Sequence, residues 1–323
     1  ETTMKKIAVL FCTALALLLG SCEKEEALHV DPIGPKYNLE DDPNDPIQHF
    51  IYETYRDFGI VVITNPTEAD YAYNFTNKNR LNLVAPPQDP AVIQAGLAFI
   101  KKNFLDLYSA EFKKQNMPFT LVMAKSIVNE SHGGSAAVDA YASTGMIAIS
   151  HIDENIGSLS DEQAKAYKAA INACFWSSYM GAVRNMFSVP EEFYQVSGGE
   201  SGSEGDYGKY ISVQKYVLNW DTFEYEPNPD YKDPDPADWY KLGFVNVVDF
   251  TMTEDPDYPY YDGYYYTTPN ATEDLSLWTN FIFATSSSEI ATMGQTYERI
   301  QQKYEILKKA LEDAGCDLSL ITQ

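Results

Sequence analysis

"INACFWSSYMGAVRNMF", residues 171–187, is the stretch on which the interpretation of this chain depends. Fifteen consecutive residues, 169–183, carry no formal charge, in a chain with 47 acidic and 23 basic side chains. Such a run predicts either an ordinary buried helix or a helix that forms the floor of an active site. The residue types at particular positions of this helix decide between the two.

The ends of this helix are marked by local signals. Ser160 is a typical N-cap residue, and two acidic residues follow it in the first turn, where the helix dipole favours negative charge. Pro190 disfavours helical geometry at the residue before it. One long helix is therefore expected from Asp161 to about Phe187.

The composition is that of a globular protein. The 323 residues are 45% hydrophobic and 14% aromatic, enough for a sizeable core in one or two domains. The formal net charge of −24 argues against nucleic acid as a partner, because a phosphate backbone is bound by clustered Lys and Arg.

The N-terminal segment resembles a bacterial lipoprotein signal. Two lysines precede the apolar run IAVLFCTALALLL, and Leu-Gly-Ser-Cys closes it at Cys22. The resemblance implies a signal peptide over 1–21, a lipid on Cys22 and an outer-membrane anchor. Residues 22–44 are polar, acidic and Pro-punctuated, and they are expected to form a flexible tether. Outside these segments only Cys174 and Cys316 remain, and the sequence leaves open whether they pair.

The rest of the chain mixes helical and strand patterns, which predicts an α+β fold. The expected helices are 46–58, 90–114, 161–187, 272–284 and 287–314, and the expected strands are 59–64, 69–75, 119–128 and 145–150.

The order of these elements resembles a known family. With the Asp70-Tyr71 pair, LGFVN (242–246), TEDLSLWTNFIF (272–283) and YEILKKALEDAGCDL (304–318), the chain is similar to the zinc-binding metallopeptidase lipoproteins of Bacteroidetes, which are associated with SusC/SusD glycan-uptake systems. The resemblance implies a single zincin-like domain over 45–323, with a small mixed sheet packed against long helices. It also implies cell-surface exposure on the outer membrane.

In that family the central helix carries H-E-x-x-H-x-x-H, which brings three imidazoles to one Zn²⁺ and a Glu to the metal-bound water. Alignment through Pro190 places Ser177, Gly181 and Arg184 at the ligand positions and Ser178 at the general base. A neutral Ser is a poor zinc ligand, Gly has no side chain, and Arg brings a positive charge. The residues therefore indicate a degenerate member without a catalytic metal or other cofactor.

Other chemistries are weaker alternatives. The chain has four histidines, at positions 29, 49, 132 and 151, and none lies in the central helix. A serine nucleophile would need a His within hydrogen-bond reach and an oxyanion hole. An active metallopeptidase or other hydrolase with a rearranged site remains the alternative function.

Acidic residues in two places leave a choice of roles. Asp233-Pro-Asp235 could supply oxygen ligands to Ca²⁺, but Asp in Pro-rich turns is usually turn chemistry. The pair Glu273-Asp274 matches an acidic pair of the family, and an acidic helix start is favoured over a catalytic role.

The tyrosine-rich run 258–268 is the remaining candidate site. Exposed Tyr combines a flat apolar face with a hydroxyl, which both sugar rings and protein partners can use. The candidate binding residues are Tyr260, Tyr261, Tyr264, Tyr265 and Tyr266. The expected function is binding of a glycan or of a SusC/SusD-type partner in an outer-membrane nutrient-uptake system. The alternative for these tyrosines is packing against the body of the protein.

Overall fold

The structure is a computed structural model that describes residues 36–71, 81–129, 136–198, 205–250 and 265–321. The chain divides into two compact units, Glu1–Asn38 and Leu39–Gln323, and the fold described below is that of the second unit. The expected signal peptide and Cys22 lie outside the described residues. Among the helices that the structure describes, none has the length and apolar character needed to span a bilayer.

A four-stranded mixed sheet forms the centre of this unit. Three parallel neighbours, β1, β3 and β7, are followed at one edge by β6, which runs antiparallel to β7. Their bounds are Val61–Ile63 for β1, Thr120–Met123 for β3, Met146–Ile149 for β7 and Ala140–Ser143 for β6. Every residue of the three parallel strands is buried, as expected for strands covered on both faces. The strands predicted at 59–64 and 145–150 are therefore confirmed. The single strand predicted over 119–128 is confirmed only in its first part, because residues 124 and 125 separate β3 from β4 (Ser126–Asn129), which belongs to another sheet.

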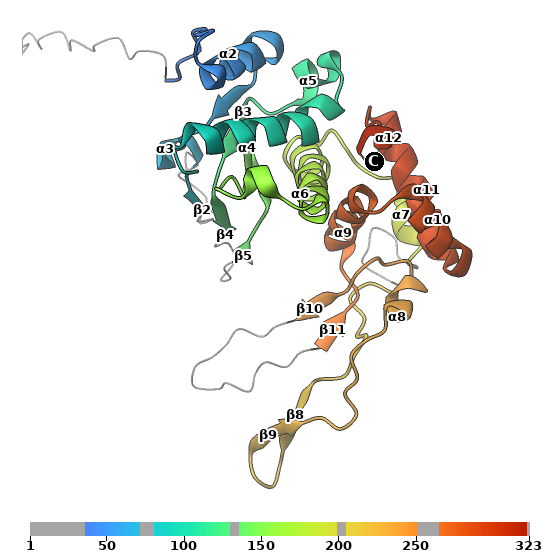
Figure 1. Ribbon diagram of the computed structural model, residues 1–323. Coiled ribbons are helices and arrows are strands. Elements are labelled where there is room, and N and C mark those ends of the chain that lie inside the picture. Colours follow the sequence, from blue (N-terminus) through green and yellow to red (C-terminus); the bar gives the residue numbers. More distant parts are fainter. Residues whose placement is uncertain (1–35, 72–80, 130–135, 199–204, 251–264, 322–323) are drawn as a thin grey trace, which may run out of the picture. The chain divides into compact units, whose positions relative to one another are not determined.

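Helix α4 (Pro90–Asn103) packs closely against this sheet (Figure 1). Gly96 makes the contact possible, because a Cβ atom there would come within 2.6 Å of Ile152 and 2.7 Å of Met123 at the end of β3. Helix α2 (Pro46–Phe58) contacts both β1 and α4. Its predicted start is confirmed, since the Asp45 carboxylate accepts hydrogen bonds from the backbone N–H groups of residues 47 and 48.

The other strands in the described residues form three smaller sheets. Strands β2 (Leu81–Val84), β4 (Ser126–Asn129) and β5 (Ala136–Ala137) form an antiparallel sheet in the order β2-β4-β5. Strands β8 (Tyr216–Asn219) and β9 (Glu224–Pro227) form a hairpin, and β10 (Val248–Phe250) pairs with β11 (Tyr265–Thr267).

The remaining helices belong mainly to the second half of the chain, where α11 packs against α10 and also contacts α9 (Figure 1). Their bounds are α3 Glu68–Tyr71, η1 Leu105–Leu107, α5 Ala110–Asn116, η3 Ile156–Ser158, α6 Asp161–Ala173, η4 Cys174–Val183, α7 Glu191–Gln195, α8 Pro236–Tyr240, α9 Ala271–Ala284, α10 Ser287–Thr296, α11 Glu298–Asp313 and α12 Leu318–Ile321.

Other predicted elements differ in the structure. The strand expected over 69–75 is wrong, because α3 occupies its first residues; residues 72–75 lie outside the described part. The helix expected over 90–114 breaks at Phe104 (φ −137°, ψ −65°), and Ser109 caps a separate α5. The long terminal helix is interrupted at Tyr297, whose extended backbone separates α10 from α11.

The helices and small sheets confirm the predicted α+β class. One connected hydrophobic core runs from Ile51 in α2 through the central sheet to Leu318 at the C-terminal end. It includes Phe175, Trp176 and Tyr179 from residues 171–187, so the uncharged run lies largely within the core.

Candidate functional site: a groove beside the central helix

A groove of about 310 Å³ lies beside the central helix. It is bounded by α6 and the start of η4 on one side, by residues 137–140 next to the edge strand β6, and by α9. The lining includes Ser177, Ser178, Asp139 and Asn280, with alanines between them. The predicted helix therefore does form one wall of an open site, of a size that suits a small ligand or a few residues of a chain.

The helical geometry changes at this groove. Helix α6 ends at Ala173, and η4 continues it as a ten-residue π-helix with i→i+5 hydrogen bonding. The backbone N–H of Arg184 donates to the Tyr179 carbonyl at 2.8 Å, five residues back. A single α-helix to Phe187 was therefore wrong in type and in its end, because the π turns stop at Val183. π-Helical segments are rare and are frequent at functional sites.

The far side of η4 is anchored in the aromatic core. Phe175 and Trp176 are fully buried, and the Trp176 ring packs edge-on against Phe187 with centroids 5.2 Å apart. The Trp176 indole N–H donates to the Tyr108 hydroxyl at 3.0 Å, and Tyr108 donates to Asn172 at 2.8 Å. These contacts fix the orientation of the helix and leave Ser177 and Ser178 on the groove side.

The four positions matched to the zinc motif do not converge on one site. Ser177 and Ser178 line the groove, whereas Gly181 and Arg184 are absent from its lining. The Ser177 hydroxyl donates to the Ala173 carbonyl at 2.7 Å. The Arg184 guanidinium lies over the Tyr179 ring at 5.8 Å. The i, i+4, i+7 convergence that an α-helix would give is lost in the π-helical backbone.

These donors do not fit a zinc ion. Ser177 offers a neutral hydroxyl that is already hydrogen-bonded, Gly181 offers no ligand, and Arg184 is permanently cationic. Among the residues that the structure describes, no three His, Cys, Asp or Glu side chains are placed to hold a metal.

The histidines within the described residues belong to other contacts. The His49 ring pairs with Asp41 at 2.7 Å on the surface, and the hydrogen bond with Asp41 raises the pKa of His49. His151 pairs with Asp139 at 2.7 Å and stacks on Tyr167 with ring centroids 4.1 Å apart. His151 thus touches a groove residue but does not itself line the groove. The other two histidines lie outside the described residues.

The two cysteines of this unit are free thiols. Cys174 lines the groove and Cys316 is buried next to α11. Burial raises the pKa of the Cys174 thiol to about 12, against the opposing effect of a hydrogen bond with Ser178, and burial also raises the pKa of Cys316. Both thiols therefore stay protonated and poorly nucleophilic near neutral pH.

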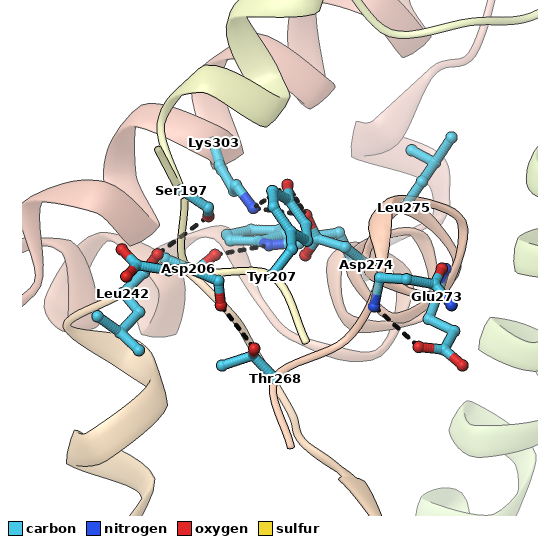
Figure 2. A network of polar contacts seen from close by, with 12 residues as sticks. Ser197, Asp206, Tyr207, Leu242, Thr268, Glu273, Asp274, Leu275 and Lys303 are labelled. Carbon is cyan, nitrogen blue, oxygen red and sulfur yellow. Dashed lines mark hydrogen bonds and ion pairs between the residues drawn. The ribbon is translucent and has the colours of Figure 1, made fainter. Parts of the chain in front are cut away.

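A second polar cluster is buried where α9 meets α11 (Figure 2). The Lys303 ammonium donates to the Asp274 carboxylate at 2.5 Å, and their side chains are 0% and 1% exposed. The Tyr207 hydroxyl donates to the same carboxylate oxygen at 2.8 Å. The rings of Phe193 and Phe244 lie 4.7 Å from the ammonium, within cation–π range. Burial lowers the pKa of Lys303 to about 8 and raises that of Asp274, despite their mutual attraction.

The role expected from the sequence for the pair Glu273-Asp274, an acidic helix start, is correct only for Glu273. Glu273 does serve the helix start, since it accepts the backbone N–H of Asn270 in a capping box. Asp274 instead forms the buried ion pair. The available signal was the register of α11: Lys303 sits between Ile300 and Leu307, at a core-facing position of an otherwise apolar stripe.

Of the candidate tyrosines, Tyr260, Tyr261 and Tyr264 lie outside the described residues. Tyr265 and Tyr266 are half-buried on β11, where Tyr265 packs edge-on against Tyr210 at 4.9 Å. Tyr210, which sequence reasoning did not single out, is 70% exposed.

The aspartates considered for calcium have local roles. The Asp235 carboxylate caps α8 by accepting the backbone N–H of Ala237 at 2.8 Å. The Asp233 carboxylate accepts the hydroxyl of Tyr231 at 3.0 Å. The Asp233 contact is local turn chemistry, the role favoured from the sequence, whereas Asp235 is a helix cap.

Comparison with known proteins gives one structural likeness. The chain is similar to a crystal structure described as a "putative zinc-binding metallo-peptidase" from Bacteroides caccae, at 13% identity and a TM-score of 0.47, with 88% of this chain and 92% of that chain covered. No protein-family model matches the sequence, and no curated protein matches it. A likeness at 13% identity concerns the fold alone and assigns neither an activity nor a residue correspondence.

Proposed function

We propose that this chain is a lipid-anchored cell-surface protein, a zincin-like and catalytically inactive relative of the zinc metallopeptidases. In this proposal it binds a glycan or a protein partner as a component of an outer-membrane nutrient-uptake system. The lipid is attached at Cys22, and residues 22–44 tether the binding domain to the membrane.

The side chains that line the groove support the proposal that the site is not catalytic. The groove is open, but the side chains that the central helix presents to it are Ser177, Ser178 and Cys174. The Ser177 hydroxyl is committed to a backbone carbonyl, and the Cys174 thiol is protonated at neutral pH. Besides hydroxyls, an amide and alanines, the groove holds one carboxylate, Asp139, which is paired with His151. The lining can therefore bind a ligand, but it presents no activated nucleophile.

The alternative, a hydrolase with a rearranged site, has one observation in its favour. Asp139 lines the groove and pairs with His151, which gives an Asp–His pair beside two serines. The outward contact of His151 is a stacked Tyr167 ring rather than a serine hydroxyl. Binding is therefore the function that the geometry supports best.

Hydrolysis assays separate the two functions. Purified chain is incubated with fluorescein-labelled casein and with p-nitrophenyl acetate, with and without 1,10-phenanthroline. The proposal predicts no turnover above the blank for the wild type. Turnover that disappears in Ser178→Ala or in His151→Ala establishes the rearranged hydrolase instead.

Binding is tested at the predicted tyrosines. The wild type and a variant with Tyr264, Tyr265 and Tyr266 replaced by Ala are applied to a glycan array. Loss of the wild-type signal in the variant supports these residues as part of the binding surface. Unchanged binding removes them from it.

A further inference from the structure

The tip of the β8–β9 hairpin exposes large aromatic side chains. Trp220 and Phe223 are 75% and 74% exposed. Ten large apolar side chains are conspicuously exposed in the described part of the chain, and five of them lie in one segment: Tyr210, Val213, Val217, Trp220 and Phe223. None of the residues 208–235 belongs to the hydrophobic core of the described part of the chain or packs against it. Such a concentration of exposed apolar surface is typical of a binding site.

The tip is held in a fixed shape. The side-chain oxygen of Asn219 accepts the backbone N–H of Asp221 at 2.9 Å, and its amide donates to Glu226 across the hairpin at 2.8 Å. The Phe223 N–H donates to the Asn219 carbonyl at 2.8 Å. Phe223 has φ of 57°, a left-handed conformation that is strained for a bulky side chain. Strain of this kind persists where the surrounding contacts enforce it, often at ligand-binding sites.

The polar groups of the tip define the complementary chemistry. Residues 219–226 contain three carboxylates and no Lys or Arg. Within the described residues, the Asp221 and Glu224 carboxylates make no hydrogen bond or ion pair. Ionised carboxylates only accept hydrogen bonds, so a ligand seated here has to bring O–H or N–H donors as well as an apolar face.

The area and the charge of the tip disfavour three classes of ligand: a protein, a membrane and an anionic glycan. One Trp and one Phe bury about 150–250 Å² each, so the tip offers about 300–500 Å², below the roughly 800 Å² per partner of a stable protein interface. Insertion into a membrane would bury Asp221 beside the rings, and a carboxylate in apolar surroundings costs several kcal/mol. Polyanionic glycans are repelled by these carboxylates and by the net charge of −24.

We propose that the tip of the β8–β9 hairpin binds neutral, hydroxyl-rich polysaccharide chains. Sugar rings stack on Trp220 and Phe223, and their hydroxyls donate to Asp221 and Glu224. This inference deepens the binding function proposed above and rests on its glycan-binding form, but it places the binding on a different segment from the tyrosine run.

The test uses the unlipidated chain, residues 23–323, in native affinity gels that contain amylopectin, xyloglucan, galactomannan, arabinoxylan or laminarin. Polygalacturonate is the anionic control. At least one neutral polysaccharide is expected to retard the wild type, and Trp220→Ala with Phe223→Ala is expected to weaken that binding at least tenfold. Tyr55→Ala, an exposed aromatic on α2, is the matched control and is expected to bind like the wild type.

A second readout reports coverage of the tip directly. Trp220 is 75% exposed, whereas Trp176 and Trp278 are 0% exposed and Trp239 is 9% exposed. Acrylamide quenching of tryptophan fluorescence therefore reports mainly on Trp220, and saturating polysaccharide is expected to reduce it.

Four results overturn the inference: no retardation by any neutral polysaccharide, unchanged binding by the tip variant, preference for polygalacturonate, or Trp220-dependent sedimentation with phosphatidylcholine vesicles. Unchanged binding by the tip variant refutes this inference and leaves the proposed function in place. Phenanthroline-sensitive proteolysis refutes the proposed loss of catalysis and does not bear on polysaccharide binding at the tip.

Discussion

Replacing Lys303 by Met tests the buried ion pair between α9 and α11. The Nζ–Oδ2 separation is 2.5 Å, and both side chains are almost completely excluded from water. At an effective dielectric constant of about 20, two unit charges at this distance attract by about 7 kcal/mol, most of which offsets the cost of removing both charges from water. Removing only the lysine leaves the Asp274 carboxylate buried without its cation.

The expected loss for Lys303→Met is about 3–5 kcal/mol in the free energy of unfolding, the usual cost of breaking a buried pair. At about 2 °C per kcal/mol for a domain of this size, the melting temperature falls by about 6–10 °C. Replacing both partners, with Lys303→Met and Asp274→Leu together, recovers most of this loss because no unpaired charge remains.

Urea unfolding followed by circular dichroism measures these changes. Lys309→Met is the matched control: the same substitution, on the same helix, breaks the exposed pair with Asp313, whose side chains are 75% and 66% exposed. An exposed pair contributes about 0–1 kcal/mol. The reasoning is refuted if Lys303→Met costs no more than Lys309→Met, or if the double variant is less stable than Lys303→Met alone.

Three further predictions concern other parts of the domain. Burial alone would raise the pKa of Asp206, but hydrogen bonds from Lys209 and Arg299 lower it on balance. Its contribution to stability is therefore present above the unfolded-state pKa and is lost as the pH falls through the lower folded-state pKa. Acid unfolding curves of Asp206→Asn are expected to be flatter than those of the wild type below about pH 4, and coincident curves contradict this. Because burial raises the pKa of both thiols, little thiolate is present at pH 8, and Cys174 and Cys316 are expected to react with Ellman's reagent much more slowly in the native chain than after unfolding in urea. Equal rates would contradict this expectation. The double variant Ser177→His with Gly181→His places histidines at two of the matched ligand positions, and it is expected to hydrolyse no casein in the presence of zinc. The π-helical backbone does not align the ligand positions, and the general base is still missing. Measurable zinc-dependent hydrolysis would contradict this prediction.

The sequence predicted helix starts correctly where a capping side chain near the start determines them. The caps at Asp45, Asp89 and Ser160 are all formed by side-chain oxygens that accept backbone N–H groups, as their residue types indicate. The buried strands were recognisable because β-branched and apolar residues dominate them. The periodicity of 90–114 was correct on both sides of the break at Phe104.

The errors have tertiary causes. Nothing in the residues around Phe104 forbids a continuous helix; the break lets the Phe104 and Tyr108 rings both pack against Phe175. The π-helix likewise has no strong local signal, and its register coincides with the packing of Trp176 on Phe187 and the hydrogen bond to Tyr108. Contacts between distant parts of the chain decide such details.

The candidate site was only partly predictable. That Ser177, Gly181 and Arg184 are unsuited to bind zinc could be read from their residue types, because the chemistry of metal binding disfavours them in any backbone geometry. The groove itself could not be foreseen, since its walls come from three separate segments. The exposed tip at Trp220 and Phe223 required knowledge of burial, because the same aromatic residues in a sequence are equally typical of a core.

Metal analysis of the purified chain tests the central claim most directly. Residues 23–323 are incubated with excess ZnCl₂, dialysed exhaustively against metal-free buffer, and measured by inductively coupled plasma mass spectrometry. Because Ser177, Ser178, Gly181 and Arg184, the positions matched to the zinc motif by resemblance, offer no suitable ligand, the chain is expected to retain less than about 0.1 equivalent of zinc. One equivalent of zinc per chain that survives dialysis would contradict the account.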